Sequence, residues 1–221
     1  LGDKTGNVDC KIWNADSAGI NDFEPKDYVY INGEAKTFNG SLQIDIRQIR
    51  KADESEYDIA DFIPTTKKNI DEMYDSIIKC ISQVNNNYLH ALLEEFFVND
   101  KEMIEKFKLS SAAKSIHHNF AGGLVEHTLG VARLCAFYSK QYPAINQDLL
   151  LTAALLHDIG KIYEFTEFPE NDYSDEGNLL GHIIIGIEMV SEKAKCIPGF
   201  PEDTLTQLKH CIAAHHGKLE F

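Results

Sequence analysis

Hydrophobic and polar residues alternate along the first fifty residues of the chain. The alternating apolar positions fall in three short runs: Val8, Cys10 and Ile12, then Val29 and Ile31, then Leu42, Ile44 and Ile46. A period of two puts the apolar side chains of each run on one face of a strand. The Asn39-Gly40 pair between the last two runs is a strong signal for a two-residue hairpin. Residues 1–50 are therefore predicted to form a small antiparallel β unit.

The pattern changes in the following segment. Residues 51–66 carry many acids, a proline and little periodicity, which is typical of an exposed linker between domains. From residue 67 onward, apolar residues recur every three or four positions, as on the buried side of helices. Further helices are predicted over residues 124–140, 146–157, 180–195 and 203–216. The chain is thus predicted to have an α+β multidomain fold, with a β unit at 1–50 and an all-α domain at 67–221.

Composition narrows the class of protein. No apolar run approaches the roughly 18 residues that a membrane-spanning helix needs, so no membrane contact is expected. The five cysteines are far apart and form no CxxC pair, which favours a reducing, cytoplasmic setting over a disulfide framework or a zinc ribbon. No basic-then-apolar leader is present, and a chain that begins with Leu1 is expected to be a fragment. The formal net charge of −14 argues against the basic surface usual in nucleic-acid-binding proteins.

Histidines gather in the second half of the chain, where eight of the nine lie between residues 117 and 216. The pair His157-Asp158 ends an almost wholly apolar stretch, so both side chains are expected to be buried. Burying an imidazole beside a carboxylate requires a compensating partner, and a divalent cation is one. An isolated pair of this kind is more often a hydrogen-bonded core pair. Other predicted helices, however, also present histidines from their apolar sides: His127, His182, His215 and His216.

The order H…HD…H…HH, with the phrase HDIGK at its centre, resembles the HD-domain metal-dependent phosphohydrolases. The segment AAKSIHHNFAGGLVEHTLGV, which follows the β segment DKTGNVDCKIW, more narrowly resembles the YhaM-type 3′→5′ exoribonucleases, and the resemblance covers nearly the whole chain. In that family an OB-fold precedes the HD domain. The resemblance implies a partial OB-like barrel at 1–50 that begins inside its domain. It also implies an HD domain at 67–221 that ends before the family's last metal ligand, a further Asp.

The resemblance also implies a set of metal ligands, in which Asp158 bridges two ions: His127, His157, Asp158, His182, and one or both of His215 and His216. It implies manganese as the metal. By coordination preference the mixed set also admits Fe, Co, Ni or Zn, whereas Mg fits less well. Two such ions can activate a shared water, polarise a phosphoryl oxygen and stabilise the leaving alkoxide, so Asp158 is expected to be catalytic.

Several residues near the predicted centre are candidates for contact with a substrate. Lys161, one helical turn from Asp158, either holds a phosphate oxygen as a catalytic residue or is merely solvated. His117 and His118 lie in a predicted loop, where they either contact substrate or are surface residues without a role. For Arg133, a solvated position is favoured over contact with substrate.

The β unit offers candidates for binding a single strand. Trp13 and Tyr30 are candidates for base stacking, and Lys11, Lys36 and Arg47 for phosphate contacts. Aromatic residues in a small barrel are more often part of its core, and this alternative stays open.

The resulting hypothesis is a metal-dependent enzyme that shortens single-stranded RNA, with single-stranded DNA left open, from the 3′ end. Two alternatives remain: an HD phosphohydrolase acting on a nucleotide or cyclic nucleotide, and a non-catalytic single-strand-binding module. A homo-oligomer is compatible with all three hypotheses. Residues 1–50 carry a net charge of −2, so most of the −14 lies in the rest of the chain. Each bound divalent ion adds +2 where a phosphate must sit, so weak, metal-dependent attraction of the substrate is expected.

Overall fold

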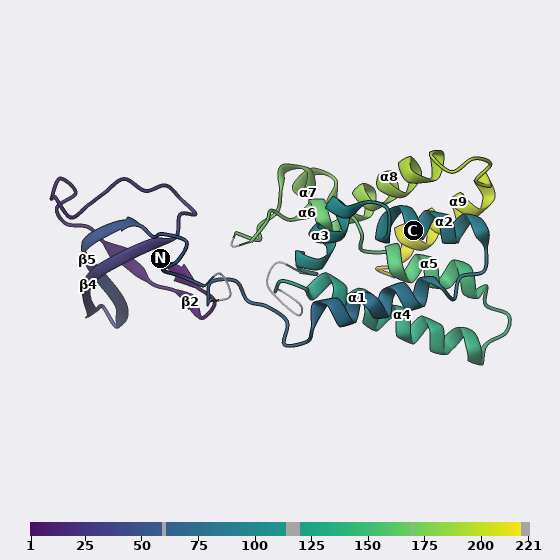
Figure 1. The fold of residues 1–221 in the computed structure, drawn as a ribbon, viewed down its shortest axis with the longest axis horizontal. Coiled ribbons are helices and arrows are strands. Elements are labelled where there is room, and N and C mark those ends of the chain that lie inside the picture. The colour runs from purple at the N-terminus through teal and green to yellow at the C-terminus, as the bar shows by residue number, and fades with distance from the viewer. Residues whose placement is uncertain (59–60, 114–119, 169, 218–221) are drawn as a thin grey trace. The chain divides into compact units, whose positions relative to one another are not determined.

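The chain divides into two units, Leu1–Pro64 and Thr65–Phe221, in a computed structural model that describes residues 1–58, 61–113, 120–168 and 170–217 (Figure 1). The first unit carries all the described strands and the second all the described α-helices. Within these ranges, no helix combines the length and the apolar character needed to cross a membrane.

The β unit contains two small sheets. Its strands are β1 (Gly2–Asp3), β2 (Gly6–Asn7), β3 (Asp9–Lys11), β4 (Val29–Phe38) and β5 (Ser41–Lys51). β1 pairs antiparallel with β2, and the other three form a sheet in the order β3-β5-β4. The predicted hairpin is confirmed, because Asn39 and Gly40 join β4 to β5 with φ values of 51° and 84°. Positive φ at both central residues is what a two-residue I′ turn requires.

The prediction of a wholly antiparallel unit is wrong for β3. This strand pairs parallel with β5, with Cys10 opposite Ile44. A long connection over residues 12–28 separates β3 from β4. Since a tight turn forces neighbouring strands to run antiparallel and a long connection does not, β3 is able to join the sheet in the other direction.

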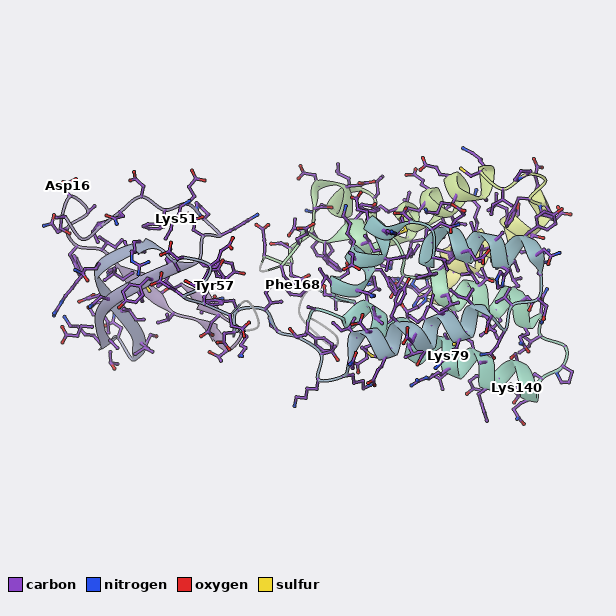
Figure 2. All side chains as sticks on the ribbon, in the orientation of Figure 1. Asp16, Lys51, Tyr57, Lys79, Lys140 and Phe168 are labelled. Atoms are coloured by element: carbon purple, nitrogen blue, oxygen red, sulfur yellow. The ribbon has the colours of Figure 1, made fainter. Side chains whose placement is uncertain are left out.

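The segment predicted as a linker, residues 51–66, is largely folded onto the β unit. Tyr57 stacks on Tyr28 with ring centroids 4.2 Å apart, and Phe62 packs edge-on against Tyr28 at 4.9 Å. Figure 2 shows Tyr57 beside the strands of this unit. Aromatic packing therefore orders a segment whose acidic composition predicts an exposed connection, and the first unit extends to Pro64.

The second unit is built from helices, most of which are joined by short connections. Its described helices are α1 (Ile70–Ile81), α2 (Asn87–Phe97), α3 (Lys101–Leu109), α4 (Gly123–Gln141), α5 (Gln147–Leu156), α6 (Lys161–Glu164), α7 (Asp175–Leu179), α8 (Gly181–Lys195) and α9 (Glu202–Ala214). Several begin at a polar residue whose side chain accepts a hydrogen bond from a main-chain N–H of the first turn, as at Asn69, Asn86, Asp100 and Asn146. The four helices predicted individually are confirmed as α4, α5, α8 and α9, to within two residues at each end.

Helix α5 carries the core toward the histidine cluster. It packs against α4, α9, α2 and α1, and residues 151–156 are all buried. A helix surrounded in this way is apolar on every side, which explains why its sequence shows no amphipathic stripe. Because α5 ends at His157, the two residues that follow Leu156 are delivered directly from the core into the cluster.

Candidate metal centre

Asp158 lies where several helices begin or end. It follows α5 directly, and its side chain is only 7% exposed. The imidazoles around it come from α4 (His127), the C-terminal end of α5 (His157), the first turn of α8 (His182) and the C-terminal end of α9 (His215). Four helices thus supply one buried cluster.

The two carboxylate oxygens of Asp158 face different imidazoles. Oδ2 lies 3.3 Å from Nε2 of His127 and 3.4 Å from Nε2 of His157. Oδ1 lies 3.4 Å from Nε2 of His182 and 3.5 Å from Nε2 of His215. The carboxylate therefore divides the four ring nitrogens into two pairs, one pair on each oxygen.

Hydrogen bonds at Nδ1 fix which ring nitrogen carries the proton. Nδ1 of His157 lies 2.8 Å from the carbonyl oxygen of Ala154, and Nδ1 of His215 lies 2.7 Å from that of Ile212. A carbonyl oxygen can only accept, so Nδ1 donates and the neutral ring keeps its lone pair on Nε2. Nε2 of His127 and Nε2 of His157 are also only 3.1 Å apart. The cluster thus gathers acceptor atoms that need a shared positive partner.

Three buried atoms of the cluster have no hydrogen-bond partner within the described part of the chain: Asp158 Oδ1, His182 Nε2 and His215 Nε2. Each such atom costs about 1–3 kcal/mol if nothing replaces its lost water. Carboxylate oxygen and neutral imidazole nitrogen are the ordinary ligands of divalent transition-metal ions. The residues present therefore fit a metal centre.

The possible ligand atoms form two groups, in each of which all atoms lie within 4.8 Å of one another: His127, His157 and Asp158 in one, and His182, His215 and His216 in the other. The structure thus brings together all six residues predicted as ligands. His216 is the exposed member of the second group. Partial burial and the nearby rings of His215 and His182 lower the pKa of His216, which favours the neutral form that binds a metal.

The electrostatics of the cluster keep Asp158 ionised. Burial by itself raises the pKa of Asp158, but the imidazoles of His127, His157 and His215 outweigh it and hold that pKa well below its usual range. Burial likewise lowers the pKa of His215, yet the Asp158 carboxylate more than reverses this and the pKa of His215 is raised. The site therefore favours positive charge beside the Asp158 carboxylate.

Glu164 is a buried member of the site that sequence reasoning missed. Its Oε1 lies 2.8 Å from Nδ1 of His182 and accepts a hydrogen bond of 3.0 Å from the main-chain N–H of the same residue. Lys161 lies between two carboxylates, with Nζ 3.9 Å from Asp158 Oδ1 and 3.9 Å from Glu164 Oε2. In the segment KIYEF, a glutamate between two aromatic residues is a weak signal of such a role, because its partner His182 lies on another helix.

Two glycines allow the backbones around the site to approach closely. A Cβ on Gly160 would collide with the carbonyl oxygen of His182 and lie 2.7 Å from the main-chain nitrogen of Gly186. A Cβ on Gly177 would collide with the carbonyl oxygen of Glu164. The distances between Asp158, His182 and Glu164 therefore depend on the absence of side chains at both positions.

The remaining candidates near the centre have different outcomes. Lys161, with a side chain 12% exposed, is held within the site rather than solvated. Arg133 is exposed on α4, and six residues place it about 240° around the helix from His127, so it faces away from the cluster. His117 and His118 lie outside the described residues.

In the β unit, three of the five predicted binding residues line one hollow of about 410 Å³: Trp13, Lys36 and Arg47. Trp13 is 73% exposed, so it belongs to the surface rather than the core. The ammonium of Lys11 lies 5.2 Å from the centre of the Trp13 ring. Tyr30, also exposed, lies under the guanidinium of Arg50 at 4.7 Å.

Acidic side chains occupy the same hollow. Asp45 accepts a hydrogen bond of 3.1 Å from the indole of Trp13 and pairs with Lys36 at 2.9 Å. Glu34 pairs with Arg47 at 2.9 Å. Two of the three basic groups predicted to contact phosphate, Lys36 and Arg47, are therefore each paired with a carboxylate.

Comparison with known proteins agrees with this geometry. The family model for the HD domain matches residues 124–220, which include every residue of the metal centre. The chain is 33% identical to a protein of Listeria innocua named "3'-5' exoribonuclease YhaM", over 100% of this chain and 70% of that protein. Proteins of the same name from Bacillus subtilis and from a Geobacillus species are 32% and 31% identical, again over the whole of this chain and over 69% and 67% of their own lengths. No solved structure matches the chain.

Proposed function

The chain belongs to the family of 3′-5′ exoribonuclease YhaM, and from this membership we propose that it is a metal-dependent hydrolase that removes nucleotides from the 3′ end of single-stranded RNA. The observation that carries the proposal is the Asp158 centre, where Asp158 Oδ1, His182 Nε2 and His215 Nε2 are buried without hydrogen-bond partners among the described residues. Such a centre has the chemistry to hold divalent cations, and the relatives' name supplies the reaction.

Two ions are proposed, one for each oxygen of Asp158. His127 and His157 would hold the ion on the Oδ2 side, and His182 and His215, with His216, would hold the ion on the Oδ1 side. When bound, such ions would supply the Lewis acidity that lowers the pKa of water and stabilises the leaving ribose oxygen. Manganese is the proposed metal, and the same ligands also suit Fe, Co, Ni or Zn.

Lys161 is proposed to hold a non-bridging phosphate oxygen as a point charge. Its ammonium is largely buried beside the Asp158 carboxylate. Asp158 and Glu164 keep Lys161 in place at equal distances of 3.9 Å, and the ring of Phe165 lies 5.8 Å from its ammonium. This fixed position lets Lys161 orient a phosphate without first being ordered by it.

The β unit is proposed to be an OB-like surface that binds the single strand. The hollow beside Trp13 combines an exposed indole with two cations, and this is the combination that stacks bases and contacts phosphates. The five cysteines of the chain, none of them in a disulfide, support the cytoplasmic setting that we propose for such an enzyme.

The function is tested with a 5′-labelled single-stranded RNA and Mn²⁺. Wild-type protein is expected to produce a ladder that shortens from the 3′ end, and Asp158→Asn is expected to lose at least a hundredfold in rate, because both ions share that carboxylate. A circular RNA of the same sequence should resist, since it has no 3′ end. Cleavage of the circular RNA would show an endonuclease, and hydrolysis of mononucleotides or cyclic nucleotides alone would show a different phosphohydrolase. Equal rates of RNA shortening for wild type and Asp158→Asn would show that the metal centre does not take part in the reaction. A DNA of the same sequence tests single-stranded DNA as a second substrate.

A further inference from the structure

Glu164 stands apart from the other acids of the helical unit because it is buried and bonded to a single residue of the metal centre. It is 6% exposed and ends the short helix α6. One of its oxygens, Oε1, accepts from both the ring Nδ1–H and the main-chain N–H of His182. One carboxylate oxygen therefore holds both the backbone and the ring of the same residue.

The position of His182 explains why it needs this partner. His157 and His215 lie at the C-terminal ends of their helices, where the carbonyl oxygen three residues earlier accepts from Nδ1. His182 lies in the first turn of α8, where a helix exposes N–H donors and offers no preceding carbonyl. No side chain of its own segment caps α8. Glu164 supplies from α6 the acceptor that the other two histidines obtain from their own helices.

Glu164 is itself firmly held. Its carbonyl oxygen accepts a hydrogen bond of 2.9 Å from the N–H of Ser174, and the backbone of Gly177 packs directly against it. Its second oxygen, Oε2, faces Lys161. The acceptor is therefore fixed before any metal or substrate arrives.

We propose that Glu164 is a positioning residue that fixes the tautomer and the orientation of His182, and thereby sets the affinity for the ion on the Oδ1 side of Asp158. The ion on the Oδ2 side, held by His127 and His157, does not depend on it. This inference rests on the proposed function only in requiring that the centre binds metal. Acceptors behind a metal-binding histidine typically contribute 10- to 100-fold in metal affinity.

The test compares three variants of the full chain by calorimetric titration with MnCl₂. Glu164→Met removes the acceptor while keeping the volume of the side chain, and is expected to weaken one binding event at least tenfold and leave the other within twofold. Glu164→Gln retains an oxygen that can accept from His182 and is expected to recover most of the affinity. Glu176→Gln, at an exposed position on α7, is the matched control and should bind as wild type.

The outcomes separate this inference from the proposed function. If wild type binds no Mn²⁺, the metal centre itself is refuted. If wild type binds two ions and Glu164→Met binds them equally well, or loses both events equally, the positioning role is refuted. Glu164→Gln behaving as badly as Glu164→Met would also overturn it, since the charge rather than the hydrogen bonds would then matter. Nitrogen NMR of the metal-free wild type gives a reading that needs no variant: His182 should be protonated at Nδ1, and a ring protonated only at Nε2 would contradict the proposal.

Discussion

Substituting Gly160 by alanine should open the contact between α6 and α8, although the backbone of Gly160 suits alanine. Its φ of −64° and ψ of −16° are ordinary helical values, so backbone conformation imposes no penalty, and alanine should gain about 0.4–1 kcal/mol because it restricts the unfolded chain. The new Cβ, however, would collide with the carbonyl oxygen of His182 and lie 2.7 Å from the nitrogen of Gly186. Both neighbours are backbone atoms, so no side chain can rotate away.

The expected magnitude follows from these two opposing effects. Forcing a methyl group into a filled core costs about 1–3 kcal/mol, and rigid backbone neighbours place this case at the upper end. After the gain from the restricted unfolded chain, a net loss of free energy of unfolding of about 1–2 kcal/mol remains. For a unit of this size, each kcal/mol shifts the melting temperature by about 2–4 °C. The melting temperature of Gly160→Ala should therefore fall by about 2–8 °C, and Mn²⁺ affinity should fall with it because His182 moves away from Asp158.

Gly186 provides the matched control from the other side of the same contact. A Cβ there would lie 3.4 Å from its nearest neighbour, the nitrogen of Gly160, which is within ordinary van der Waals contact. Gly186→Ala should therefore keep wild-type Mn²⁺ binding and gain up to about 1 kcal/mol of stability from helix propensity. Thermal unfolding followed by circular dichroism, with calorimetric titration of Mn²⁺, measures both effects. Equal melting temperatures and equal affinities for the two alanine variants would refute the close-approach reasoning.

Further expectations concern the β unit. Trp13→Ala should weaken the binding of single-stranded RNA by about 5- to 150-fold, which corresponds to about 1–3 kcal/mol for one stacked base. Fluorescence anisotropy measures this affinity, and an unchanged value would show that the indole does not contact RNA. The double variant Glu34→Gln, Asp45→Asn should instead bind RNA about two- to fivefold more tightly at low salt, because the carboxylates no longer compete with phosphate for Lys36 and Arg47 through ion pairs of about 0.2–1 kcal/mol. Weaker binding of RNA by this variant would contradict that reasoning. The pKa of Glu56 is lowered to about 2, first by its bond to Arg50, and Arg50→Met should return it toward the ordinary glutamate value in an NMR titration. Because the folded-state pKa of Glu56 is depressed, the stabilising contribution of this pair is present above the unfolded value and is lost as pH falls toward about 2.

Much of the fold follows from local sequence signals. The hairpin needs only Asn39 and Gly40, whose tolerance of positive φ is a property of the two residues themselves. The long helices follow from apolar residues at helical spacing, which is also a local property. The parallel pairing of β3 with β5 depends on where a long connection returns, and the packing of Tyr57 on Tyr28 depends on the finished β unit. Neither contact produces a periodic pattern in the sequence from which it could be predicted.

The site shows the same division. Histidines on the apolar sides of helices can be read from spacing, and the structure brings all six predicted ligands together. Glu164 could not be identified in this way, because its role arises from the contact of α6 with α8 that Gly160 permits. For Arg133, the six-residue separation from His127 already predicts another face of the helix and favours a solvated position, and the structure leaves Arg133 exposed.

The direction of the helices around Asp158 has a consequence for the order in which ligands bind. His157 and His215 occupy the C-terminal ends of α5 and α9, where aligned peptide dipoles leave roughly half a negative charge on each helix. The positive end of α8 is offset by the Glu164 carboxylate that accepts from its first turn. An empty centre therefore repels a phosphodiester and attracts cations. Metal should therefore bind first and reverse the sign of the local electrostatic potential, so that RNA should bind only to the metal-bound site. When metal is scarce, RNA should then not occupy a centre that cannot cleave it.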